Sequence, residues 1–389
     1  MDNIWSYNKY INLTINILLF MVGINVFHYG QLILPIICLI IFIDNKLVFK
    51  VNNPYTFIIL CLFAVSFYGF SYPLGFYSVM GFTFPMAYYI GSNVKDIDET
   101  KIKKILYILA IAMGIHIILN IFYEINIRGI DKFINSSKHF DFWTKDRIST
   151  TTTAMNFVLL ASMFYYLLLH ENNKIVKYIS IIVFVFDLLF CLITGRRTSL
   201  LMLFVCIIFS IIYDNYYLRK TNNMKKYLSY LMYISIFLLI IALMLYFDLF
   251  GIYSLFDNFY IIDKLRQGFD NNRLKIFVEA LKLAPSHLWG KQEISKIIGI
   301  EIHDLFFDTF DYAGIVPCLL LITYTIMLLE NIKKLHLLKN QYNVLFMSVF
   351  LAITIQMFLE PMMTGGSLFV IAVIIIGTLY EGLVLNAKK

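Results

Sequence analysis

The feature that most restricts the fold of this chain is a series of apolar runs, each close to twenty residues long. A helix of about twenty residues crosses the hydrocarbon core of a bilayer, whereas the strands of a membrane barrel are about ten alternating residues long. Only 15% of the 389 residues are charged, against roughly 25% in soluble domains. We therefore expect an all-α polytopic membrane protein in which residues 1–389 form a single integral membrane domain.

Twelve spans are predicted, with a large outer loop over residues 251–303 between the ninth and the tenth. The second span is the least secure, because Asp44 and Lys46 shorten its apolar run, and a segment that enters the bilayer only partly is the alternative. The spans cover approximately residues 10–28, 31–49, 54–71, 74–92, 102–123, 153–170, 175–194, 198–217, 227–250, 304–329, 342–360 and 366–385.

The distribution of Lys and Arg predicts the orientation of these spans. The predicted inner connections carry 18 of these residues, whereas the short outer connections near Tyr29, Ser71 and Gly365 carry none. Because cytoplasmic connections collect positive charge, both termini are expected in the cytoplasm. The same bias accounts for the net charge of +7 without a nucleic-acid partner.

One short outer connection breaks this pattern. Arg196 and Arg197 stand between two apolar runs, on the side that should lack positive charge. A miscounted span would make them an ordinary cytoplasmic flank, but moving them would invert the neighbouring Lys clusters. The functional alternative is an anion site at the outer surface, because guanidinium groups can bind a phosphate through two parallel hydrogen bonds.

The predicted outer loop at about residues 124–152 mixes basic and aromatic side chains. This composition favours an interfacial helix that lies on anionic headgroups, and stacking of a sugar on Trp143 is the alternative. The Ser and Thr run that starts at Ser149 is expected to supply the N-cap of the sixth span.

We expect the function to lie in the long hydrophilic interruption from Leu265 to Gly314. It contains two arginines, Arg266 and Arg273, and an amphipathic segment follows the second of them. His303 stands where the chain re-enters the membrane. These arginines and the pair in the short turn are predicted to converge.

Three carboxylates follow His303 along the predicted tenth span. Asp304, Asp308 and Asp311 have the spacing i, i+4, i+7, which predicts one helical face. Carboxylates in such a segment are costly unless they face a wet cavity or a cation, so they indicate a functional interior.

These residue types suit one reaction class. A neutral His303 beside Asp304 could take a proton from a sugar hydroxyl, while fixed arginines stabilise the charge on a departing diphosphate. His303 taken alone could also be a polar residue at a helix start. The sequence has no metal-ligand spacing and no nucleotide-binding loop. It therefore predicts metal-independent glycosyl transfer from a lipid diphosphate, without a cofactor.

Three segments resemble the O-antigen polymerase and O-antigen ligase superfamily. They are Thr194-Gly195-Arg196-Arg197-Thr198-Ser199-Leu200, the stretch from Asn272-Arg273-Leu274 through Trp289-Gly290, and His303 followed by Gly314. The resemblance covers about residues 180–380. It implies a GT-C-like inverting glycosyltransferase of the bacterial plasma membrane that uses undecaprenyl-diphosphate-linked glycans as donor and acceptor on the outer face. A chain-length regulator protein would be a further partner.

The resemblance also implies roles for single residues. Arg197 takes the place of the family's arginine turn, Arg273 that of the loop arginine and His303 that of the histidine that ends the loop. Arg196 and Arg266 are neighbours of the first two positions, and Gly314 is a structural part of the motif.

Two positions depart from the ligase pattern. Ligases usually have an amide or Ser directly after the His and a Gly, Thr or Tyr three residues past the Gly, whereas this chain has Asp304 and Pro317. These departures favour a polymerase that joins repeat units of O-antigen, capsule or exopolysaccharide, with a ligase as the alternative. A polysaccharide flippase is the alternative from another class, although its polar residues would lie near the midplane of both halves.

The predicted topology can be tested by cysteine labelling. A membrane-impermeant reagent added outside should label a cysteine placed at Ser295, in the large outer loop, but not one placed at Lys225, in a predicted inner connection. The reverse pattern would contradict both the orientation and the placement of the candidate site.

Overall fold

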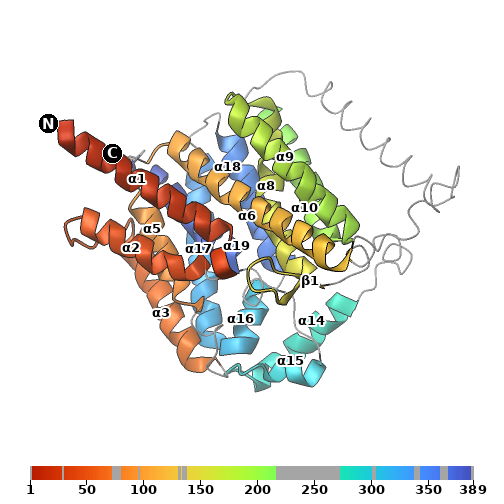
Figure 1. Ribbon diagram of the computed structural model, residues 1–389. Coiled ribbons are helices and arrows are strands. Elements are labelled where there is room, and N and C mark those ends of the chain that lie inside the picture. Colours follow the sequence, from red (N-terminus) through yellow and green to blue (C-terminus); the bar gives the residue numbers. More distant parts are fainter. Residues whose placement is uncertain are drawn as a thin grey trace, which may run out of the picture. The chain divides into compact units, whose positions relative to one another are not determined.

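The computed structural model describes residues 2–28, 30–71, 80–94, 97–129, 133, 138–215, 272–299, 304–336, 342–359 and 367–386 (Figure 1). Within these residues the chain is predominantly α-helical, and it divides into two compact units. The first comprises residues 1–116, 271–337 and 353–389, and the second comprises residues 117–270 and 338–352. Because the chain passes between the units several times, neither is continuous in sequence. The single membrane domain stays a prediction.

The described helices confirm a helical membrane protein. Five of them are long and apolar enough to cross a bilayer, and shorter apolar helices accompany them. The five are α6 (Glu99–Arg128), α8 (Thr150–Leu169), α9 (Lys174–Ile193), α17 (Ile315–His336) and α19 (Ser367–Asn386). The predicted ninth span, 227–250, lies outside the described residues.

The remaining elements complete the described chain. They are α1 (Asp2–Gly23), the 3-10 turns η1 (Val26–His28) and η2 (Gly30–Leu32), α2 (Ile33–Asp44), α3 (Pro54–Phe70), α5 (Thr83–Ser92), β1 (Lys138–Phe140), β2 (Arg147–Ser149), α10 (Arg197–Tyr213), α14 (Asn272–Leu283), η5 (Ala284–Ser286), α15 (Glu293–Ile298), α16 (Leu305–Ala313) and α18 (Asn343–Leu359).

Several helices begin at a side-chain cap that can be read in the sequence. Asn53 caps α3, where Pro54 follows as the first helical residue, and Asn173 caps α9. Ser149 accepts a hydrogen bond from the Thr151 amide at the start of α8, which confirms the predicted cap. Such caps satisfy amides that have no partner within the helix.

The first unit is built around α19. Within its apolar window 94% of the residues are buried, whereas α17, which packs on it together with α5, buries only 28%. A helix that is apolar on all sides and enclosed on all sides is a core helix. The exposed apolar face of α17 is the kind of surface that a bilayer covers.

A buried carboxylate joins four helices of the first unit. Glu381 of α19 accepts hydrogen bonds from Tyr88 of α5, from Asn331 of α17 at 3.4 Å and from Thr56 of α3 at 3.5 Å. Because a buried charge without donors is very costly, these bonds fix how the four helices meet.

The second unit is built around α8, of which 78% of the apolar window is buried. Helices α9 and α10 pack on it. Only 33% of the corresponding window of α9 is buried, and its exposed side includes Ile182, Val185 and Leu189. These residues repeat at helical spacing and form an apolar stripe that suits lipid contact.

The predicted interfacial helix between the fifth and sixth spans is wrong for residues 138–149. Helix α6 continues to Arg128, and strands β1 and β2 pair as an antiparallel hairpin with Lys138 opposite Ser149. The reason is tertiary: side chains of α6 bind hairpin amides, with Glu124 accepting from Phe140 and Asn120 from Phe142, both at 2.8 Å. A pattern of basic and aromatic residues could not show these bonds.

The predicted tenth span is also wrong as a single helix. The chain forms α16, breaks at Gly314 and starts again as α17. Gly314 has φ of 85°, a conformation that L side chains rarely adopt, and Pro317 lies in the first turn of α17, where a missing N–H is tolerated.

The second span is shorter than predicted, and the fourth is described only in part. Helix α2 ends at Asp44 after 12 residues, as the charges there indicated. The described part of the fourth span, α5, has 10 residues, and residues 72–79 before it lie outside the described chain.

At each end of α3, segments meet that the charge pattern assigned to the same side of the membrane. Directly before α3, the Asn52 side chain donates to the Thr378 carbonyl of α19, in the half of that helix predicted to lie on the inner side. At the last residue of α3, the Phe70 ring lies 5.8 Å from the Trp289 ring of the predicted outer loop. The orientation of these segments in a membrane stays a prediction.

The Glu381 cluster predicts a selective loss of stability. Tyr88→Phe removes one donor to a buried carboxylate and should lower the free energy of unfolding by about 1.5–3 kcal/mol. The measurement is SDS-induced unfolding in mixed micelles. Tyr55→Phe is the matched control because Tyr55 is 76% exposed on α3 and should change little. Equal effects of the two substitutions would contradict the role of the cluster.

Candidate functional site

The described part of the predicted outer loop is a folded body in the first unit rather than an extended loop. The sequence predicts an amphipathic segment after Arg273, and this segment forms α14, followed by η5, α15 and α16. Their apolar sides share a small core with the start of α17, formed by Ala280, Ile294, Phe310 and Cys318. Burial of these side chains holds the segment against α17.

Two glycines allow the backbone of this segment to approach the break between α16 and α17. A Cβ on Gly290 would lie 2.5 Å from the Gly314 amide nitrogen, and one on Gly314 would lie 2.7 Å from the Leu288 carbonyl oxygen. Both glycines have positive φ, at 75° and 85°. Any side chain at either position would therefore meet backbone atoms that cannot move aside, in addition to strain.

Backbone hydrogen bonds close this junction. The Ile315 amide donates to Leu288 at 2.9 Å, and the Gln292 amide donates to Asp311 at 2.7 Å. The two family-like segments that contain Gly290 and Gly314, 24 residues apart in the sequence, are thus parts of one structural element.

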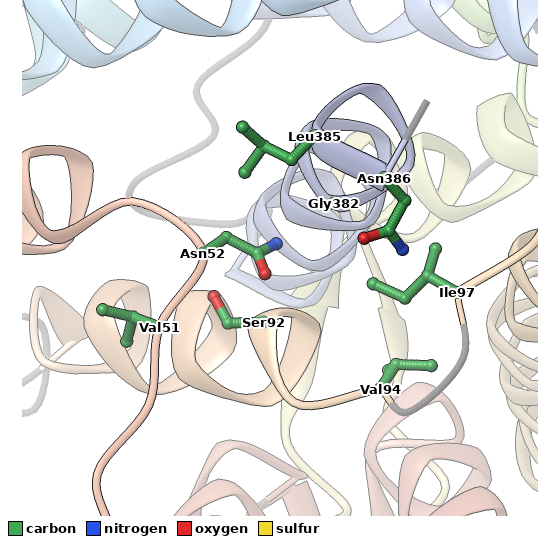
Figure 2. A pocket seen from close by; sticks show the side chains of 8 residues that line it. All are labelled: Val51, Asn52, Ser92, Val94, Ile97, Gly382, Leu385 and Asn386. Carbon is green, nitrogen blue, oxygen red and sulfur yellow. The ribbon is translucent and has the colours of Figure 1, made fainter. Parts of the chain in front are cut away.

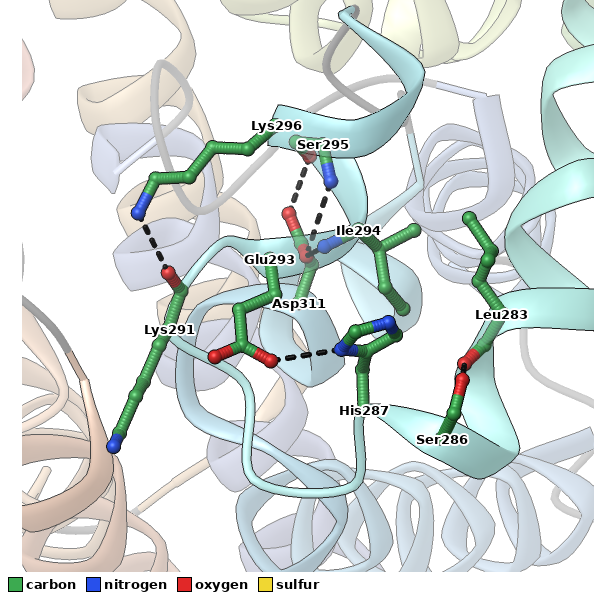
Figure 3. A network of polar contacts seen from close by, with 9 residues as sticks. All are labelled: Leu283, Ser286, His287, Lys291, Glu293, Ile294, Ser295, Lys296 and Asp311. Atoms are coloured by element: carbon green, nitrogen blue, oxygen red, sulfur yellow. Dashed lines mark hydrogen bonds and ion pairs between the residues drawn. The ribbon is translucent and has the colours of Figure 1, made fainter.

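The carboxylate of Asp311 stabilises α15 from the neighbouring helix (Figure 3). Its Oδ1 accepts from the amides of Ile294 at 3.0 Å and Ser295 at 3.3 Å, and its Oδ2 accepts from the Ser295 hydroxyl. A cysteine that replaces Ser295 would lose this hydroxyl contact, so exposed Lys296 is the better place for a topology probe.

Asp304 lies outside the helical face on which the sequence placed it. It is the N-cap of α16, and its Oδ1 accepts from the amides of Phe306 at 2.8 Å and Phe307 at 3.0 Å. Burial raises the pKa of this carboxyl, while the two amide donors act to lower it. Asp308, one turn further on, is buried within α16.

The short arginine turn belongs to the second unit. Gly195 has φ of 64°, the chain turns there, and α10 begins at Arg197. The Nη1 of Arg196 donates to the Thr151 hydroxyl of α8 at 2.5 Å, so this side chain is held against α8. The N-terminus of α10 adds the positive end of a helix dipole at the same place, which favours an anion.

The remaining predicted site residues are only partly placed. His303 and Arg266 lie outside the described residues, and for Arg197 and Arg273 only the backbone is described. The convergence of the arginines and the contact of His303 with Asp304 therefore stay predictions.

The structure shows a histidine–glutamate pair that the sequence pattern did not predict. The Nδ1 of His287 lies 2.7 Å from the Oε2 of Glu293, across the turn that contains Gly290 (Figure 3). A carboxylate at Nδ1 favours the tautomer in which Nε2 is free to accept a proton. The Trp-Gly pair between these residues was the available signal, because a glycine there allows the chain to reverse.

The site shows no metal centre among the residues that the structure describes: no three His, Cys, Asp or Glu side chains gather there. The arginine turn is a described element suited to an anionic ligand. No protein-family model matches the chain, and no curated protein matches it with significant similarity.

The glycine junction can be tested with alanine. Gly290→Ala and Gly314→Ala should each destabilise the outer segment by more than the ~1–2 kcal/mol of a left-handed alanine, because a backbone contact is added to the strain. Hydrogen exchange of residues 287–298 would show this as a loss of protection.

Gly299→Ala separates the two causes. Gly299 also has positive φ, at 79°, but an added Cβ there meets nothing within 4 Å. If Gly299→Ala were as disruptive as Gly290→Ala, the close contact would have no importance beyond the strain.

Proposed function

We propose that this protein is a metal-independent inverting glycosyltransferase. It polymerises undecaprenyl-diphosphate-linked repeat units into O-antigen, capsule or exopolysaccharide on the outer face of the bacterial plasma membrane. In this proposal the chain has twelve spans and a GT-C-like arrangement, both termini are cytoplasmic, and segment 251–303 carries part of the active site.

The observation that carries the proposal is the junction of Gly290 with Gly314. Two separate motif segments of the resemblance meet there backbone to backbone, and both glycines have a steric reason to be glycine. The third segment, the arginine turn, combines Arg196 with the N-terminus of α10. This combination suits a diphosphate.

Each group has a role in this reaction. Arg197 and Arg273, with Arg196 and Arg266 beside them, hold the diphosphate of the donor and stabilise its negative charge as the sugar leaves. His303 takes the proton of the acceptor hydroxyl that attacks the sugar. The His287–Glu293 pair is a second candidate for this base, because it already has the geometry of an oriented imidazole.

The ligase alternative gains support from the cap at α16. Asp304 binds the first amides of that helix, and Asn or Ser would serve equally well as a cap. The acidic residue is therefore weaker evidence against a ligase than its charge suggests. Pro317 can also be explained by local structure, because it occupies the first turn of α17, where a residue without an N–H is tolerated.

The direct test compares glycans of cells with and without this protein. A polymerase predicts that repeat-unit ladders disappear while single units remain. Lipid-linked ladders that fail to reach their final acceptor would instead establish a ligase. Unchanged glycans of both kinds would contradict the proposal.

The proposed roles predict that charge alone is insufficient. Arg197→Lys and Arg273→Lys should lose most elongation by the purified protein, because Lys cannot form the two parallel bonds of a guanidinium. His303→Ala should slow elongation by about 10²–10⁴-fold if His303 is the base, and His287→Ala should do so if the alternative holds.

Two controls accompany these variants. Arg219→Lys and His336→Ala change residues on the predicted inner side and should leave elongation unchanged. If the His303→Ala variant and the His287→Ala variant both elongate within a few-fold of the wild type, neither histidine is the base.

A further inference from the structure

A polar pocket of about 340 Å³ lies in the first unit (Figure 2). It includes Val51 and Asn52, directly before α3, whereas the Trp289 ring lies near Phe70 at the other end of that helix. The connection from α2 to α3, the connection from α5 to α6 and the end of α19 all contribute to it. The charge pattern predicts that all three segments lie at the inner membrane surface. Nothing in the proposed glycosyl transfer uses this pocket.

A glycine keeps the pocket open. A Cβ on Gly382 would lie 2.6 Å from Cδ1 of Ile97 and 3.0 Å from Nδ2 of Asn52, so a side chain there would occupy the space. The Asn52 amide is itself held, because its Nδ2 donates to the Thr378 carbonyl at 3.0 Å. The wall around the space is therefore fixed by specific contacts.

The polar lining contains a hydroxyl that suits a ligand. Asn52, Ser92 and Asn386 line the pocket, facing the apolar side chains of Val94, Ile97 and Leu385 (Figure 2). The Ser92 Oγ is buried and has no hydrogen-bond partner among the residues that the structure describes. Burial of an unpaired hydroxyl is costly, and a ligand oxygen would remove this cost.

The segments that line the pocket carry an excess of positive charge. Lys50, directly before lining residue Val51, accepts a hydrogen bond at its carbonyl from Asn93, directly after Ser92. Among the described residues in and directly beside the three contributing segments, the basic residues outnumber the acidic ones by five to three: Lys46, Lys50, Lys101, Lys103 and Lys104 against Asp44, Asp98 and Glu99. This excess favours an anionic ligand.

An apolar rim stands beside the charges. Leu47, Val48 and Phe49 are exposed on the connection that precedes Asn52, and the Phe49 ring stacks on Tyr89 of α5 at 4.7 Å. Exposed apolar residues next to lysines are typical of a surface at the bilayer interface. A ligand with an apolar body and an anionic, hydroxyl-bearing head would fit both features.

We infer that this pocket binds the headgroup of an anionic phospholipid. The headgroup hydroxyls bind Ser92, Asn52 and Asn386, the phosphate lies toward Lys50, and the acyl chains leave along the apolar rim. Basic pockets between membrane helices bind lipid headgroups in this way. The volume also suits a small polar group rather than a whole lipid.

The test uses the full-length protein in a mild detergent, with bound phosphatidylglycerol counted by native mass spectrometry during a titration. Ser92→Ala should weaken binding by about three- to tenfold, as expected for one lost hydrogen bond, without lowering the unfolding midpoint, since the hydroxyl has no protein partner to lose. Asn386→Leu should weaken binding similarly, and Lys50→Gln should reduce the preference over phosphatidylcholine.

Asn172→Leu is the matched control, because Asn172 is an exposed residue of the second unit. It should bind phosphatidylglycerol like the wild type. The inference is overturned if Ser92→Ala and Asn386→Leu both retain full binding, or if phosphatidylcholine binds equally well. Displacement of the lipid by soluble glycerol 3-phosphate at equal concentration would also overturn it, because the acyl chains would then contribute nothing.

Discussion

The contact between the backbones at Gly290 and Gly314 is the constraint on which the candidate site depends. It brings the end of α16 against the turn after η5, and the amides of Gln292 and Ile315 then bond across the junction. The small apolar core around Ile294 and Phe310 forms on the same contact. A methyl group added to either glycine would push the two backbones apart. The hydrogen bonds across the junction and the apolar core beside it would then be disturbed as well, because packed interiors have little room to adjust.

Buried carboxylates hold the helices of this chain together. Asp311 binds the amides of α15, Glu124 binds the hairpin, and Glu381 receives donors from three helices. In an apolar environment each unsatisfied polar group is costly, so such an acceptor stabilises one arrangement over its alternatives. A carboxylate within an apolar run therefore has a structural reading beside the functional one.

The two ends of the first unit have different chemistry. One end carries the glycine junction, the His287–Glu293 pair and exposed Trp289, and the other carries the amide-lined pocket and its lysines. The apolar length of α3 lies between them. The two proposed ligands, a glycan carrier and a lipid headgroup, would therefore bind at opposite ends of this unit.

The sequence by itself determined what depends on local patterns. Runs of apolar residues predicted helices in a membrane, and Ser149 predicted the start of α8. The shortness of α2 followed from Asp44, because a charge ends an apolar run whatever surrounds it. Gly314 and Pro317 were also a sequence signal for the break between α16 and α17, although the apolar pattern alone predicted one continuous helix.

Only the tertiary structure decided which distant groups meet. The hairpin depends on Glu124 and Asn120 of another element, Asp311 caps a helix 17 residues before it, and His287 pairs across a turn with Glu293. Each of these bonds joins residues whose separation carries no periodic signal. Hydropathy reports the medium in which a segment lies, but hydrogen-bond partners depend on packing, and packing is a property of the folded chain.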